Sequence, residues 1–102
     1  MSNKHYVEVA LYQLKNEIED SQFLAVSDEA TDVYRKLPGF VRRELMKSED
    51  GKWVDLVYWE NREVAKQAEP TVYHDATIAK VMAVLNTETM IFIHAQPVRQ
   101  DS

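Results

Sequence analysis

The first regular pattern of apolar and polar positions in the chain is an alternation from His5 to Leu14. Its period of two predicts a β-strand, with Val7, Val9 and Leu11 on one face and Tyr6, Glu8, Ala10 and Tyr12 on the other. After Asp20 or Ser21 the apolar spacing changes to three and four, at Phe23, Val26, Ala30, Val33 and Leu37. This spacing predicts an amphipathic helix, which Pro38-Gly39 should end.

A β-hairpin is predicted next. Residues 40–48 alternate as a second strand, and the run from Trp53 to Trp59 is rich in the Val, Leu, Tyr and Trp residues that favour a strand. Asp50-Gly51 between them suits a two-residue turn, so residues 47–52 form the predicted hairpin tip. Asn61 is a suitable cap for the helix that should follow.

Two short helices and a last strand complete the predicted elements. Residues 62–68 form the first helix, and we expect Pro70 to interrupt it. A second helix, from about Val72 to Leu85, carries one apolar stripe of His74, Ile78, Val81, Met82 and Leu85. Residues 88–96 alternate as the last strand, and residues 98–102 form a polar tail.

The predicted order β-α-β-β-α-β indicates a ferredoxin-like α+β fold, a four-stranded antiparallel sheet with its helices on one face. The length of 102 residues fits a single domain, residues 1–102, with a core from about residue 5 to residue 97.

The two faces of the predicted sheet differ in polarity. The aliphatic face should lie under the helices; it consists of Val7, Val9, Leu11, Val54, Leu56, Ile91, Ile93 and Ala95. The other face mixes aromatic with charged side chains, among them Glu8, Asp55 and His94. Such a face is too apolar for water, so we expect a second copy of the chain to cover it, with these charges paired at the interface. The sequence thus predicts a homodimer formed through the open face of the sheet.

Composition excludes several classes of function. A net charge of −5 argues against a nucleic-acid partner, and the absence of Cys excludes disulfides and thiolate chemistry. The chain contains no apolar run of the roughly 20 residues that span a membrane, and residues 1–5 lack the apolar region of a secretory signal. We therefore expect a cytoplasmic protein with no membrane association.

Several segments together resemble the antibiotic biosynthesis monooxygenase (ABM) superfamily of dimeric α/β barrels. The resemblance covers roughly residues 5–97 and depends on Leu37-Pro38-Gly39-Phe40, Arg43-Glu44-Leu45, residues 48–55, and Val57-Tyr58-Trp59-Glu60 followed by Ala65 and Ala68. It implies that two protomers join their sheets into a barrel and that a ligand enters between each sheet and its own helices.

The same resemblance implies a function. It indicates a cofactor-independent monooxygenase that acts on a hydrophobic aromatic molecule, with no cofactor. Quinone-forming members use an Asn, a Trp and a Tyr near one helix, and Asn61, Trp59 and Tyr73 match those residue types. The alternative is a non-catalytic homodimeric domain of the same fold that binds a small ligand.

Five residues are candidates for the site. His74 is predicted on the apolar stripe beside Tyr73, where an imidazole can act as general base on an acidic phenol. Tyr58 can orient a ligand oxygen, Arg43 can stabilise an enolate or phenolate, and Trp59 and Tyr73 can shape the pocket. The alternatives are a His74 ring bonded to a backbone carbonyl or to water, a Tyr58 packed in the core, and an Arg43 in solvent.

Two other kinds of site are not indicated. The three histidines, His5, His74 and His94, lie on separate elements without metal-ligand spacing, so no metal is expected. RNA-recognition domains share the element order, but residues 52–58 lack their Gly-aromatic motif and contain Asp55.

Overall fold

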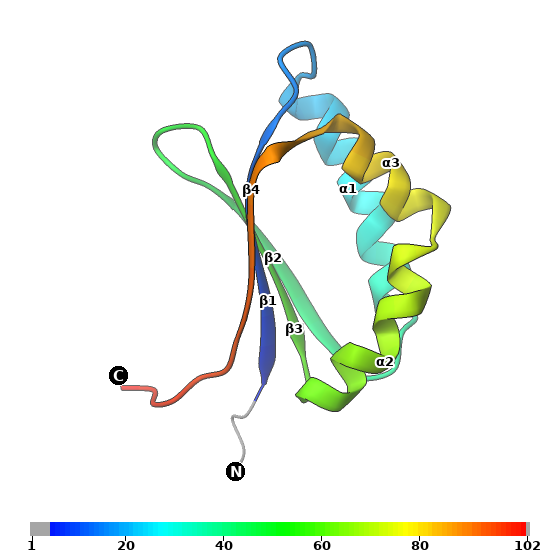
Figure 1. Cartoon of the computed structure of the whole chain (residues 1–102), viewed down its shortest axis with the longest axis vertical. Coiled ribbons are helices and arrows are strands. Elements are labelled where there is room, and N and C mark those ends of the chain that lie inside the picture. Colours follow the sequence, from blue (N-terminus) through cyan, green and yellow to red (C-terminus); the bar gives the residue numbers. More distant parts are fainter. Residues whose placement is uncertain (1–4, 102) are drawn as a thin grey trace.

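The computed structural model describes residues 5–101 and contains seven elements in the order β-α-β-β-α-α-β (Figure 1). They are β1 (Tyr6–Leu14), α1 (Asp20–Arg35), β2 (Phe40–Lys47), β3 (Trp53–Trp59), α2 (Arg62–Tyr73), α3 (Ala76–Val84) and β4 (Leu85–Ala95). The predicted ferredoxin-like α+β fold is confirmed. Most of the segment used for the signal-sequence argument, residues 1–4, lies outside the described residues.

The four strands form one sheet in the order β2-β3-β1-β4, and every neighbouring pair is antiparallel. The helices all lie on one side of this sheet, and Figure 1 shows the other side bare. No helix of residues 5–101 has the length and apolar character needed to cross a membrane.

The hairpin between β2 and β3 differs from the predicted two-residue turn. The amide of Ser48 donates to the carbonyl of Lys52 at 2.7 Å, so the loop between them contains three residues. Gly51 takes the left-handed conformation, with φ +88°, as is usual in three-residue loops. Arg43 therefore pairs with Val57, where a two-residue turn would pair it with Tyr58.

The predicted choice of sheet face is wrong. The side chains of Tyr6, Tyr12, Trp53, Val57 and Trp59 are buried on the side that faces the helices. The bare side is mainly aliphatic on β1, β3 and β4, where it carries Val7, Val9, Leu11, Val54, Leu56, Ile91 and Ile93. On β2 it carries Arg42 and Glu44, as predicted. The charged residues on the helix-facing side tolerate burial because they have partners there. The polarity of the two faces therefore did not show which face is buried.

Aromatic packing fixes the two ends of the core. Phe23 of α1 is fully buried against Tyr12 and Trp53, with ring centroids 5.7 Å and 4.8 Å away. At the other end Trp59 is 1% exposed and packs on Ala65 and Ala68, two small residues that let α2 approach the sheet. The space between these two ends is where the candidate site lies.

The helical segment after β3 also differs from the prediction. Helix α2 passes through Pro70 and ends at Tyr73, although a proline at this position removes one backbone hydrogen bond and its ring crowds the carbonyl four residues earlier. The chain breaks instead at His74. Asp75 starts α3 by accepting the amides of Thr77 and Ile78 through its side chain, at 2.7 Å and 3.1 Å.

Candidate functional site

A cavity of about 660 Å³ lies between the sheet and its own helices. This volume is within the range of pockets that hold small organic ligands, roughly 300–1,000 Å³. The helix side is lined by small or flexible apolar residues, which include Ala30, Ala68, Val72, Ile78, Val81 and Met82. The sheet side adds Ala10, Val57, Trp59, Met90 and Phe92. The walls therefore suit a hydrophobic molecule.

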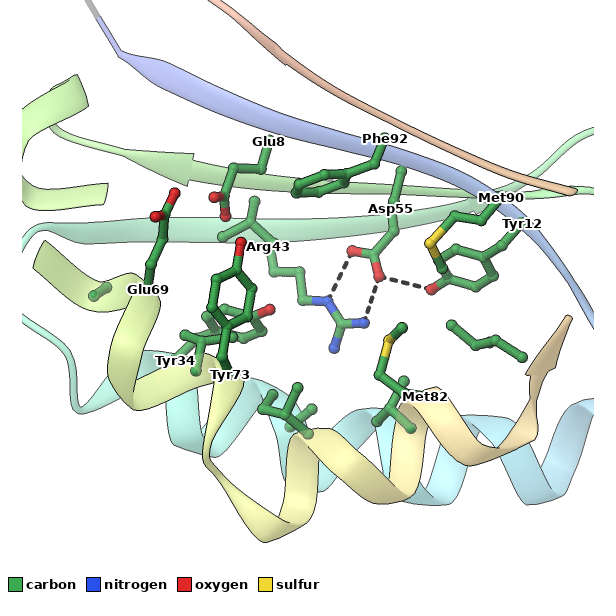
Figure 2. A pocket seen from close by; sticks show the side chains of 18 of the residues that line it. Glu8, Tyr12, Tyr34, Arg43, Asp55, Glu69, Tyr73, Met82, Met90 and Phe92 are labelled. Carbon is green, nitrogen blue, oxygen red and sulfur yellow. Dashed lines mark hydrogen bonds and ion pairs between the residues drawn. The ribbon is translucent and has the colours of Figure 1, made fainter. Parts of the chain in front are cut away.

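A bidentate ion pair forms one part of the sheet wall. Arg43 donates from Nε to one oxygen of Asp55 at 3.0 Å and from Nη2 to the other at 2.7 Å, as Figure 2 shows. The hydroxyl of Tyr12 donates to the same carboxylate at 2.6 Å. The remaining Nη1 donates to the carbonyl of Ser27 and to Thr31 Oγ1, both at 2.9 Å. This network ties β1, β2 and β3 to α1.

Burial beside this network keeps the hydroxyl groups of Tyr12 and Tyr34 protonated. Burial raises the pKa of the Tyr12 hydroxyl above its ordinary range, and the neighbouring Asp55 charge raises it further. Burial likewise raises the pKa of Tyr34, whose ring lies 5.9 Å from the Arg43 guanidinium. Both phenols stay protonated at neutral pH, so they can donate hydrogen bonds but cannot act as bases.

Glu8 occupies the other part of the sheet wall. Its Oε1 accepts the indole N–H of Trp59 at 2.9 Å, and its Oε2 lies 3.4 Å from Nε2 of His94. Glu69 of α2 points toward the same region in Figure 2. Burial raises the pKa of Glu8, the hydrogen bond of Trp59 and the charge of His94 oppose this rise, and the charge of Glu69 adds to it.

Glu8, Glu69 and His94 offer ligand atoms within 4.8 Å of one another, a spacing compatible with a cation. The donors already have protein partners, however. Glu8 bonds to Trp59 and faces His94, and Glu69 accepts from Lys66 Nζ at 3.3 Å. We therefore do not assign a metal site to this group.

Three of the five predicted site residues line the cavity: Arg43, Trp59 and Tyr73. Arg43 is not in solvent, because its side chain is only 5% exposed. Most of its N–H groups already donate to protein acceptors. Arg43 can therefore act on a ligand mainly through its positive charge and not through a hydrogen bond. The structure places these three residues around one cavity, and their role in ligand binding stays a prediction.

Tyr58 and His74 lie elsewhere. Tyr58 is on the bare side of the sheet, where its hydroxyl donates to Glu44 at 3.1 Å and its ring stacks under Arg42. The predicted placement of Tyr58 under the helices is wrong, as is the placement of His74 on the buried stripe. His74 is exposed at the end of α2, with Nδ1 2.8 Å from the carbonyl of Pro70. A catalytic role for either residue stays a prediction, without support from its position.

Sequence reasoning assigned Glu8, Asp55 and His94 to a subunit interface, which is also wrong. Glu8 and Asp55 line the cavity, and His94 lies beside Glu8. For Glu8 and Asp55 the signal is a carboxylate in the middle of a central strand, between two aliphatic neighbours and two positions after an aromatic residue. Such a residue must be buried, and it needs a partner from an adjacent element.

Solved structures with the same fold include oxygenases. A variant of SnoaB, a cofactor-independent oxygenase from Streptomyces nogalater, is 15% identical and superposes with a TM-score of 0.80, covering 94% of this chain and 95% of that one. A dimeric ferredoxin-like protein from an uncultured marine organism is 15% identical, with a TM-score of 0.74, covering 98% and 93%. An antibiotic biosynthesis monooxygenase is 15% identical, with a TM-score of 0.68, covering 92% and 99%.

The chain therefore has the fold of the ABM-like superfamily, as its sequence segments indicated. No protein-family model matches the sequence, and no curated protein matches it either. The chain resembles these solved structures in its architecture, and the cavity is the feature that bears on its activity.

Proposed function

We propose that the cavity binds a planar hydrophobic phenol and that the protein is a cofactor-independent monooxygenase. The observation that carries this proposal is the cavity itself: its walls are mainly apolar, and hydrogen bonds hold Tyr12, Asp55, Arg43 and Glu8 in place. The fold is shared with SnoaB, which is itself a cofactor-independent oxygenase.

The proposed reaction uses O₂ as the oxidant. An activated CH₂ of the aromatic substrate loses a proton and leaves an electron-rich carbanion. This carbanion reduces O₂, and the products are a carbonyl group and one molecule of water. The protein provides an apolar cavity, in which the charge of Arg43 and the protonated hydroxyl of Tyr34 can stabilise negative charge on the substrate oxygen.

Ligand binding can be tested with 1,8-dihydroxyanthrone, a tricyclic phenol with an activated CH₂. Thermal unfolding under nitrogen should show stabilisation by the probe, about 2.7 kcal/mol at a hundred times its Kd. Ala79→Trp should abolish the shift, because Ala79 is an exposed residue that lines the cavity. Ala76→Trp makes the same change on the same helix outside the lining and should keep the shift.

Catalysis is tested separately with an oxygen electrode. Oxygen consumption by the wild type, lost in Ala79→Trp and retained in Ala76→Trp, would support the monooxygenase. Binding without oxygen consumption would favour the alternative, a non-catalytic domain that holds a small ligand. One observation favours that alternative. The hydrogen bonds of Arg43 are made to protein groups, as in an ion pair that stabilises the fold.

We also propose that the protein is a homodimer that buries the bare side of the sheet. Ile91 and Ile93 are 57% and 50% exposed there, beside an aliphatic surface on β1 and β3. Leu56→Arg should convert the dimer to a monomer in sedimentation velocity, because a charge would enter the apolar interface. Leu24→Arg, at an exposed position on α1, is the matched control and should leave the dimer intact. A wild type that sediments as a monomer would contradict the proposal.

A further inference from the structure

We propose that Glu8 is the catalytic base of the cavity, that Trp59 is its positioning residue, and that His94 passes the proton from Glu8 to water. This inference rests on the proposed monooxygenase function and assigns the proton-transfer step to one carboxylate. It moves the base from the α2 terminus, where the sequence suggested it, to the central strand of the sheet.

Glu8 has the placement that a base requires. Its side chain is 13% exposed, and in Figure 2 its carboxylate projects from β1 into the cavity, between Phe92 and Glu69. The indole of Trp59 holds Oε1 at 2.9 Å, and Trp59 itself is immobilised in the core. A carboxylate with one oxygen anchored can present the other to a substrate in a fixed direction.

The other described carboxylates of the cavity are paired with cations: Glu69 accepts from Lys66 Nζ at 3.3 Å, and Asp55 accepts from Arg43. The Asp55 carboxylate is engaged by Arg43 on both oxygens and by Tyr12, so its charge is already neutralised. Tyr12 and Tyr34 remain protonated because of their burial. Among residues 5–101, Glu8 lies near one weakly basic group, His94, and no lysine or arginine forms an ion pair with it.

Burial and the charge of Glu69 favour proton uptake by Glu8, whereas the charge of His94 and the hydrogen bond of Trp59 oppose it. His94 approaches it from β4, Glu69 from α2, and Trp59 from β3, while Lys66 binds Glu69. Tyr34 and Tyr73 add hydroxyl groups to the same cavity. Burial and the Glu69 charge raise the pKa of Glu8, which makes its carboxylate a stronger base at neutral pH.

Glu8 takes one proton from the activated CH₂ of the substrate. The C–H bond of the substrate breaks, its electron pair stays on the substrate as a carbanion, and an O–H bond forms on Glu8 Oε2. His94, whose side chain is 29% exposed, lies beside this oxygen and can pass the proton to water. Glu8 is then ionised again for the next turnover.

The test compares Glu8→Gln with Glu63→Gln. Glutamine keeps an acceptor for the Trp59 indole but cannot take the proton, whereas Glu63 is an exposed carboxylate on α2 outside the cavity lining. With 1,8-dihydroxyanthrone, E8Q should bind as wild type does in thermal shift and lose about 10²–10⁴-fold in kcat. Under nitrogen, E8Q should also fail to produce the absorbance of the deprotonated probe. E63Q should match wild type in all three measurements.

Glu69→Gln gives a second readout that does not depend on E8Q folding. Loss of the Glu69 charge should lower the pKa of Glu8 and move the acidic limb of the kcat/KM profile to lower pH. An E8Q turnover within about tenfold of wild type, or an acidic limb unmoved by E69Q, would overturn the assignment of the base. If the wild type fails to bind the probe, the proposed function fails, and this inference fails with it.

Discussion

Removal of one partner from the Arg43–Asp55 pair should destabilise the protein far more than removal of a surface charge. The two side chains are 5% and 13% exposed, so little water can replace a lost partner. In Arg43→Met, the Asp55 carboxylate would keep only the hydrogen bond from Tyr12. In Asp55→Leu, the guanidinium would be left buried without its counter-ion.

The size of the effect follows from this burial. A buried charge that loses its partner costs about 3–5 kcal/mol, which is a large share of the typical 5–15 kcal/mol stability of a domain. Arg43→Met/Asp55→Leu removes both charges and leaves apolar groups in an apolar wall. The double variant should therefore be more stable than the sum of the single changes predicts, with a coupling energy of about 2 kcal/mol or more.

Urea unfolding followed by the fluorescence of the buried Trp53 and Trp59 measures these differences. Each single variant should lower the urea midpoint by about 1 M or more. The control cycle uses Arg35 and Asp32, an ion pair of α1 that is 65% and 66% exposed, where each change should cost less than about 1 kcal/mol. Equal costs in the two cycles would refute the view that burial makes the Arg43–Asp55 pair strong.

Two further predictions concern Glu8 and the two glycines. The folded state raises the pKa of Glu8 above its ordinary value of 4.5, so its stabilising contribution is present below that value and is lost as pH rises through the folded pKa. Glu8→Gln should accordingly gain stability relative to wild type as pH increases from about 4.5 to 8, and a constant difference in urea unfolding across this range would contradict the shift. Gly39→Ala should cost more than about 2 kcal/mol, because φ is +84° and a Cβ atom would lie 2.6 Å from Val64 Cβ. Gly51 has φ +88° and open space around it, so Gly51→Ala should lower the free energy of unfolding only by the backbone strain of about 1–2 kcal/mol. Equal losses of stability at the two glycines would contradict this prediction.

The sequence was sufficient for the elements and their order. Alternation located the strands, the Pro38-Gly39 turn ended α1, and Asn61 capped α2 by accepting the amide of Val64 at 2.9 Å. The prediction that Pro70 interrupts the helix was wrong, because the rest of α2 is stable enough to continue past a residue that costs it one backbone hydrogen bond.

The site was predicted less well than the fold. Arg43, Trp59 and Tyr73 line the cavity, but the choice of sheet face placed Glu8 and Asp55 at a subunit interface. Counting polar residues on each face could not reveal that Arg43 neutralises Asp55 or that Trp59 satisfies Glu8. Those pairings join residues far apart in the chain, and they depend on a hairpin register that one loop residue decides.

The three-residue loop at Glu49-Asp50-Gly51 consequently limits which insertions and deletions this protein can accept. Surface loops usually tolerate changes of length, yet a gain or loss of one residue here would shift the pairing of β2 by one position. Arg42 would then face the helices in place of Arg43, and Asp55 would lose its bidentate partner. A change by an odd number of residues at this exposed tip should therefore destabilise the protein, whereas a change by an even number should keep Arg43 opposite Val57.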